Sequence, residues 1–541
     1  MKRLLIPALF AIAIVLLVTP IPEGMKPEAH RLIAVTFLMS GLWVTNVIPL
    51  AATSLMPLVL FPLLGIMKPD DVSKSYMSDT LFLYVGGMII ALGIERWQLH
   101  RRIALHLVNL VGISPKRLVL GFLLATGFLS MWISNTACTL LMLPIVLAML
   151  RTMDEAASES GRTEATAVSL RAADAVQAPQ NHEYKGISGR TDQLAVPLLL
   201  AIAYSSSLGG MTTLVGTPTN SSAAGIYRDQ LPNAPEISMA AWLLVCGPIG
   251  AVYLAVTWFV LTRGLPGSTQ ADRLLQVDLR EKLRSLGRPG VAEVRMFLVF
   301  AFTGLLWICR KPLIVGEWTL LPGWLDACTS LFRSLGPWFP EIPGVASKGE
   351  LLSDATVSMG VAVLLFLLPS GTKDERGQSQ PLMDWKTAEK MPWDMILLFG
   401  GGFALADAFR QTDLSGWLGQ ALQEPLRGRS PWLVIAVLTG IMIFLTEFTS
   451  NVATVNTVMP TLLAMAEPLG MDPRMIFLPV TLAASCGFML PIGTPPNAIV
   501  FSTGRVSTRQ MALYGLTLNL VGIPILTIGT FLIIRPLLGI P

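Results

Sequence analysis

The sequence has little charge for its length. Asp, Glu, Lys and Arg make up 14% of its 541 residues, whereas 52% are hydrophobic. Soluble domains carry about 25% charged residues, so this balance excludes a chain of ordinary soluble domains. The net charge of +4 is too small to indicate a nucleic-acid-binding surface, and we expect no nucleic-acid partner.

Histidine and cysteine are also scarce, with four and five residues. The cysteines are odd in number, widely spaced and mostly inside apolar runs, so we expect packing residues and not disulfides or metal ligands. The histidines have no spacing typical of a metal site. The sequence also lacks a recognisable catalytic nucleophile and a Walker-type phosphate loop. We therefore expect neither an enzyme nor an organic cofactor.

Long apolar runs are what the sequence does contain. Each is about 20 residues long, enough to cross a hydrocarbon layer of about 30 Å. The predicted fold class is an all-α polytopic membrane protein with about 11 transmembrane helices and two re-entrant helical hairpins. The apolar run that ends at Pro20 is predicted to be the first span and not a signal peptide. Further spans are predicted at 30–48, 50–67, 80–98, 193–208, 239–262, 293–312, 352–369, 394–409 and 513–537.

Loop charges predict the orientation of these spans. The loops richest in Lys and Arg fall on the cytoplasmic side when the N-terminus is cytoplasmic, at 96–117, 263–295 and 371–390. Arg410, Arg427 and Arg429 fall outside and fit less well. We expect a multi-pass protein of the cytoplasmic (inner) membrane.

Two polar motifs each occur twice, in the same order. Ser134-Asn135 and Ser450-Asn451 each have a hydroxyl residue four positions before the Ser and a Pro ten positions after it. Each pair is followed downstream by Gly-Thr-Pro-x-Asn, at 216–220 and 493–497. Ser, Thr and Asn in spans often only tie helices together, and Gly and Pro often only kink them. Matched repetition favours inverted repeats with a binding site where they meet.

The polar pairs interrupt apolar stretches at 115–151 and 431–466. One continuous helix would expose their polar groups to lipid, so we expect two hairpins, entering the membrane from opposite sides. The Gly-Thr-Pro motifs predict broken helices at 193–228 and 475–503, the second with arms at 475–490 and 497–503. Each hairpin's second arm starts at the Asn, so its N-terminal amides favour an anion. Freed carbonyl and side-chain oxygens suit a monovalent cation such as sodium.

Four other segments have simpler readings. Residues 152–192 are predicted to be a polar cytoplasmic insertion with one surface helix at 164–176, and 271–290 an amphipathic cytoplasmic helix. The stretch 313–350 is predicted to be a Trp- and Pro-rich external loop. Gly400, Gly401 and Gly402 are predicted to pack helices and not to bind phosphate. Glu447 is a candidate proton or cation ligand, although its counterpart is Met131.

These motifs resemble those of the divalent anion/sodium symporter family of dicarboxylate, citrate and sulfate transporters, and the resemblance extends from the first hairpin to the last span. It implies a homodimer in which a transport domain carries the site across the bilayer by an elevator movement. The implied boundaries are a scaffold at 1–111 and 293–429, transport halves at 112–262 and 430–541, and an arm at 263–292.

The resemblance also implies residue roles. The implied sodium ligands are Ser130, Ser134, Asn135 and Gly216 in one site, and Thr446, Thr449, Asn451 and Gly493 in the other. The implied substrate ligands are Ser134, Asn135, Thr136, Thr217, Ser450, Asn451, Val452, Thr494 and Pro495. Val452 stands where the mirrored motif has Thr136, which removes one hydroxyl from the substrate side.

The expected function is sodium-coupled symport of C4-dicarboxylates such as succinate, malate or fumarate. A sodium-coupled citrate or sulfate symporter and a sodium-independent dicarboxylate exchanger remain alternatives of the same fold. A channel or membrane enzyme is disfavoured, because the sequence lacks a charged pore ring and catalytic groups.

Overall fold

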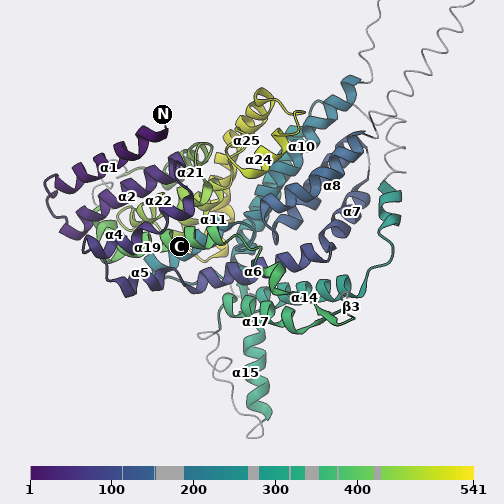
Figure 1. Ribbon diagram of the computed structural model, residues 1–541, viewed down its shortest axis with the longest axis horizontal. Coiled ribbons are helices and arrows are strands. Elements are labelled where there is room, and N and C mark those ends of the chain that lie inside the picture. The colour runs from purple at the N-terminus through teal and green to yellow at the C-terminus, as the bar shows by residue number, and fades with distance from the viewer. Residues whose placement is uncertain are drawn as a thin grey trace, which may run out of the picture.

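The computed structural model describes residues 2–112, 114–151, 153, 188–265, 279–315, 318–335, 352–373, 377–418 and 428–540. Nearly all regular structure in these ranges is helical (Figure 1), which confirms the all-α class. Five stretches in the described ranges are long and apolar enough to cross a membrane by themselves, and several shorter apolar helices accompany them. The five are Pro69–Arg96, Gln193–Gly210, Met239–Thr262, Val291–Ile308 and Thr508–Leu537. The total of 11 spans stays a prediction.

The N-terminal part contains seven helices before the first hairpin. They are α1 (Lys2–Val18), α2 (Pro27–Thr45), α3 (Leu50–Thr53), α4 (Met56–Leu63), α5 (Pro69–Ser75), α6 (Asp79–Arg96) and α7 (Leu99–Val111). The span predicted at 50–67 corresponds to the apolar helical stretch Leu50–Leu63, which a turn at residues 54–55 divides into α3 and α4. Pro57 explains the break, because it has no N–H to donate and therefore belongs in the first turn of a new helix.

Both hairpins are present at the predicted positions. Helix α8 (Pro115–Ser130) is followed by a turn and the helix Asn135–Arg151, and we call this pair hairpin A. Helices α21 (Pro431–Thr446) and α22 (Asn451–Ala464) form hairpin B. Helix α8 packs between α7 and α10 (Ser188–Gly210), and the three run side by side in Figure 1.

Both broken helices are present as well. Helix α10 ends at Gly210, and α11 (Pro218–Gln230) follows; we call these broken helix A. Helices α23 (Pro473–Ala484) and α24 (Pro495–Phe501) form broken helix B. The first arm of broken helix B was predicted to reach residue 490 but ends at 484. The longer gap contains Gly487 and Pro491, neither of which favours continuation of a helix.

The remaining elements connect these units. They are α12 (Met239–Thr262), α14 (Val291–Ile308), α15 (Trp324–Leu335), α17 (Asp354–Leu367), α18 (Trp385–Ala388), α19 (Trp393–Gln411), α25 (Thr508–Gly529), a π-helical turn (Thr530–Ile534) and α26 (Arg535–Leu537). Two antiparallel strand pairs join β1 (Leu313–Val315) to β2 (Trp318–Leu321) and β3 (Pro369–Lys373) to β4 (Ser379–Pro381).

The stretch predicted as an external loop, 313–350, therefore holds β1, β2 and α15. Helix α15 projects away from the rest of the chain (Figure 1). Of the predicted amphipathic helix at 271–290, residues 279–290 are described, and they are helical over 279–285. The surface helix predicted at 164–176 lies outside the described residues.

The glycine run in α19 packs helices, as predicted. A Cβ at Gly400 would meet the Tyr76 ring, and one at Gly402 would meet the amide of Asn456 on α22. Only glycine allows these close approaches, and the packing reading of the run is confirmed.

A buried group of charges joins the ends of α12, α14 and α17. The Arg310 side chain, 1% exposed, places its Nε 2.6 Å from Asp354 Oδ1 and its Nη2 2.6 Å from Glu236 Oε1. The Met239 N–H donates to Asp354 Oδ2 at 2.7 Å. Burial is favourable for such charges only when each has a partner, so these contacts fix how the three helix ends meet.

Candidate functional site

The two hairpin tips are held by the same side-chain contact. The Ser130 hydroxyl donates to Asn135 Oδ1 at 2.8 Å, and the Thr446 hydroxyl donates to Asn451 Oδ1 at 2.6 Å. The residue four positions before each Ser-Asn pair thus orients the Asn. Within the described residues, neither Asn amide nitrogen has a hydrogen-bond partner, so both remain available as donors.

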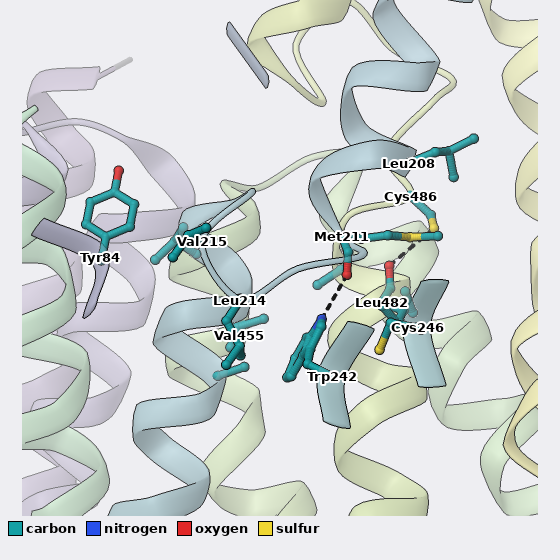
Figure 2. Close-up of a cluster of buried hydrophobic side chains, with 14 of the residues drawn as sticks. Tyr84, Leu208, Met211, Leu214, Val215, Trp242, Cys246, Val455, Leu482 and Cys486 are labelled. Carbon is teal, nitrogen blue, oxygen red and sulfur yellow. Dashed lines mark hydrogen bonds between the residues drawn. The ribbon is translucent and has the colours of Figure 1, made fainter. Parts of the chain in front are cut away.

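The linker of broken helix A, residues 211–217, is fixed from two sides. The Asn220 amide donates to the carbonyls of Gly210, Met211 and Thr213 at 2.7–3.2 Å. Trp242 of α12 donates to the Met211 carbonyl at 3.0 Å, and Leu214 and Val215 lie among Tyr84, Trp242 and Val455 (Figure 2). The last residue of Gly-Thr-Pro-x-Asn therefore satisfies carbonyls that the break in the helix leaves free.

Broken helix B repeats this arrangement. The Asn497 amide donates to the carbonyls of Gly487 and Leu490 at 2.9 and 3.0 Å. The side-chain oxygens of Asn220 and Asn497 are both buried, and neither has a hydrogen-bond partner among the described residues. Each half thus keeps an unpaired buried oxygen beside its linker, which is a feature of a site able to accept a cation or a donor.

Several oxygen atoms lie close to the linker of broken helix A. A Cβ on Gly216 would lie 2.9 Å from the Ser130 carbonyl oxygen, and one on Gly210 would meet Asn135 Oδ1. Ser130, Asn135 and Gly216, three of the four residues in one predicted sodium set, are therefore close together.

The second predicted set is assembled similarly. A Cβ on Gly493 would lie 3.0 Å from Glu447 Oε2 and 3.5 Å from the Glu447 carbonyl oxygen. Thr446 contacts Asn451 as described above. The Thr449 hydroxyl donates to the Leu445 carbonyl at 2.8 Å and lies 2.5 Å from Thr454 Oγ1. Its hydroxyl is thus already engaged within hairpin B.

Between the tips lies a cavity of about 800 Å³. All nine residues predicted to contact substrate line it: Ser134, Asn135, Thr136, Thr217, Ser450, Asn451, Val452, Thr494 and Pro495. Of the residues predicted only as sodium ligands, Thr449 and Gly493 also line it, whereas Ser130, Gly216 and Thr446 do not. Ser130 and Gly216 of the first predicted sodium set thus lie behind the cavity lining, whereas in the second set only Thr446 does.

The cavity lining also contains residues that the sequence motifs did not indicate. Trp43 and Asn46 of the α2 end, Tyr84 of α6, and Lys390 before α19 line the cavity. None belongs to a repeated motif, so the repeat gave no signal for them. Only the basic character of the loop at 371–390 pointed toward Lys390.

Glu447 lies behind the cavity and is 1% exposed. Its carboxylate accepts from the N–H groups of Met489 and Leu490 at 2.8 and 3.0 Å, and from the Asn519 amide at 2.6 Å. In the other half the contact is reversed, because the Thr213 hydroxyl donates to the Met131 carbonyl at 2.5 Å. Met131 and Glu447, which occupy equivalent positions, thus each connect a hairpin to a linker: Met131 through its backbone carbonyl and Glu447 through its carboxylate.

Replacing Glu447 should loosen that tie. In Glu447→Gln one oxygen becomes an NH₂ group that opposes an N–H donor, so we expect a loss of about 1.5–3 kcal/mol in stability. Thermal unfolding of the purified protein in detergent measures the loss. Glu467→Gln, at an exposed glutamate after α22, is the matched control and should unfold like the unaltered protein. Equal unfolding temperatures for the two variants would contradict this role.

Comparisons with known proteins agree with this geometry. The family described as "sodium:sulfate symporter transmembrane region" matches residues 2–539. The sodium-dependent dicarboxylate transporter SdcS of Staphylococcus saprophyticus is 34% identical over 542 residues, which cover 99% of this chain and 91% of that protein. The SdcS protein of Staphylococcus aureus is 33% identical over 527 residues, which cover 96% of this chain and 88% of that protein.

A solved structure has a similar fold. The YdaH transporter of Alcanivorax borkumensis superposes with a TM-score of 0.51 and 11% sequence identity, over 100% of this chain and 98% of that one. At this identity the similarity concerns the fold alone. The family match over residues 2–539 and the relatives above 30% identity show which family the chain belongs to. The chain is a multi-pass membrane protein that belongs to the sodium:sulfate symporter family.

Proposed function

We propose that this protein is a sodium-coupled symporter of C4-dicarboxylates. The observation that carries the proposal is the cavity between the two Ser-Asn tips, with oxygen sets beside it in both halves. The two SdcS relatives are named sodium-dependent dicarboxylate transporters, which favours this substrate class over others accepted by the family fold.

A dianion with one carboxylate at each end matches a site that has one hairpin tip on each side. Helices Asn135–Arg151 and α22 both begin at the cavity, and the N-terminus of a helix carries a partial positive charge. The free amides of Asn135 and Asn451 add one donor on each side. One carboxylate would thus meet each hairpin, and no residue of either motif needs to be basic.

Sodium ions would occupy the oxygen sets behind the tips. Asn135 and Asn451 each belong to both the sodium and the substrate sets, since the oxygen faces the hydroxyl of Ser130 or Thr446 while the amide nitrogen is free. A cation bound by the oxygen would hold the amide in place for the anion and offset its charge. Shared side chains of this kind give a physical basis for coupling the two solutes.

We further propose an elevator movement in a homodimer of the cytoplasmic membrane, with a cytoplasmic N-terminus. Hairpins and broken helices, within 112–262 and 430–541, would move together. Residues 1–111 and 293–429 would form the scaffold, linked by the arm at 263–292. Two walls of different origin support this division, because the cavity lies between the repeated motifs and residues of α2, α6 and the start of α19.

Uptake of labelled succinate into proteoliposomes tests the proposal. Under an inward sodium gradient, uptake should exceed that under a matched potassium gradient and should rise more steeply than in proportion to sodium. Protein-free liposomes are the control. Competition by malate, citrate and sulfate ranks the substrates, and stronger competition by citrate or sulfate would reassign the anion. Uptake that ignores sodium and requires vesicles preloaded with dicarboxylate would instead identify an exchanger.

A further inference from the structure

Lys390 is the one charged residue among the described residues that line the cavity. Its side chain is exposed, and no carboxylate in the described part of the chain forms a salt bridge with it. Basic side chains elsewhere are often paired, as Arg96 is with Asp384 at 2.7 Å and Arg310 with Asp354. Lys390 therefore presents an uncompensated positive charge to the water in the cavity.

The predicted topology places Lys390 at the cytoplasmic end of the cavity. It lies between α18 and α19, in the basic loop that the charge pattern predicts to be cytoplasmic. Asn46, the C-terminal cap of α2, and Leu92, in the last turns of α6, also line the cavity. These two helix ends are predicted to be cytoplasmic as well. In this conformation the cavity thus extends from the hairpin tips toward the cytoplasmic side.

Asn46 supplies a second polar group on this wall. It adopts φ 46°, a left-handed conformation, where it ends α2. Its side chain is exposed and has no hydrogen bond within the described residues. Lys390 and Asn46 lie outside the hairpins and broken helices, so they do not belong to the repeated motifs that hold the inner end of the site.

We propose that Lys390 is a specificity-determining residue that binds a carboxylate of the dianion at the cytoplasmic end of the cavity, during arrival or release on that side alone. This inference rests on the proposed function. An ammonium group attracts a dianion over several ångströms even in water, and a charge at a cavity mouth raises the local concentration of the oppositely charged solute. Lys390 belongs to the scaffold wall, so it stays behind when the hairpins carry the site away.

The effect of removing this charge should therefore be one-sided. Lys390→Gln should raise the KM for succinate about three- to tenfold from the cytoplasmic side, the range expected for one charge pair in a water-filled cavity. The KM from the external side and the sodium concentration for half-maximal uptake should stay unchanged. Lys390→Arg keeps the charge and should preserve both KM values.

The two sides are measured separately with intact expressing cells and with inside-out membrane vesicles, both taking up labelled succinate under a sodium gradient. Lys386→Gln is the matched control, since Lys386 is an exposed lysine of α18 that does not line the cavity. Equal KM changes on both sides, an effect only on the external side, or the same loss in Lys390→Arg and Lys390→Gln would each overturn the inference.

The same experiment tests the proposed function independently, through the uptake of succinate by the unaltered protein. Sodium-dependent uptake by the unaltered protein in both preparations supports that function. Its absence would overturn the function and this inference together. Normal uptake by the unaltered protein, with a Lys390→Gln variant that behaves like Lys386→Gln, would overturn the inference alone.

Discussion

Asn135→Ala and Asn451→Ala should each reduce kcat/KM for sodium-driven dicarboxylate uptake by about a hundredfold or more. Each change removes one amide donor from the cavity and one oxygen from the set behind it. Hydrogen bonds to charged groups contribute about 1.5–3 kcal/mol each, so losing two interactions is enough for this reduction. Initial rates in proteoliposomes, over a range of succinate and sodium concentrations, measure it.

The design separates a binding role from a folding defect. Asn109→Ala, at an exposed Asn of α7 outside the cavity, should transport normally. Both tip variants should remain monodisperse in detergent, because each change removes a single acceptor from one hydroxyl. For Thr446 an alternative acceptor, the Ala484 carbonyl, lies 2.9 Å away. Full uptake by either tip variant would refute the assignment of that hairpin to the site.

Arg310→Met should destabilise the protein more than the substitutions of Glu447, Lys390 or Lys311. It leaves Asp354, 4% exposed, without its cation, and breaking a buried ion pair typically costs about 3–5 kcal/mol. Membrane proteins often unfold irreversibly, so the measurement is the half-life of monodisperse protein in detergent at a fixed elevated temperature. The variant should lose its folded form far faster than the unaltered protein.

Two companion variants make this expectation specific. Lys311 also pairs with Glu236, at 2.6 Å, but both side chains are 41% exposed, so Lys311→Met should lose no more than about 1 kcal/mol. Arg310→Met combined with Asp354→Leu removes both buried charges and should recover part of the lost half-life. If Arg310→Met were no worse than Lys311→Met, the buried network would not hold the helix ends together.

The sequence alone was sufficient to predict those parts of the fold that a local motif determines. Ser134-Asn135 and Ser450-Asn451 place the hairpin tips, because polar residues in mid-membrane require a break in the helix. The Gly-Thr-Pro motifs place the linkers for the same reason. Repetition supplied the further information that both tips belong to one site, and the structure gathers the predicted substrate residues along one cavity.

Residues that act through tertiary contacts could not be found in this way. Lys390 lines the cavity because α19 packs against α22, and Arg310 meets Asp354 across 44 positions of sequence. Glu447 lies next to a predicted tip, yet its partners Met489 and Leu490 belong to broken helix B. Apolar periodicity also cannot report a break such as that between α3 and α4, because both pieces are equally apolar.

The glycine run of α19 has a mechanical consequence. Helices whose side chains interlock as ridges and grooves must separate before one can slide along the other. Where Gly402 faces α22 there is no such ridge. Asn456 fills this position and adds polar contacts, because its amide donates to the Leu398 carbonyl at 3.2 Å and its oxygen accepts from Ser222 at 2.5 Å. The hydrogen bonds of this one polar side chain thus hold α19, α11 and α22 in register.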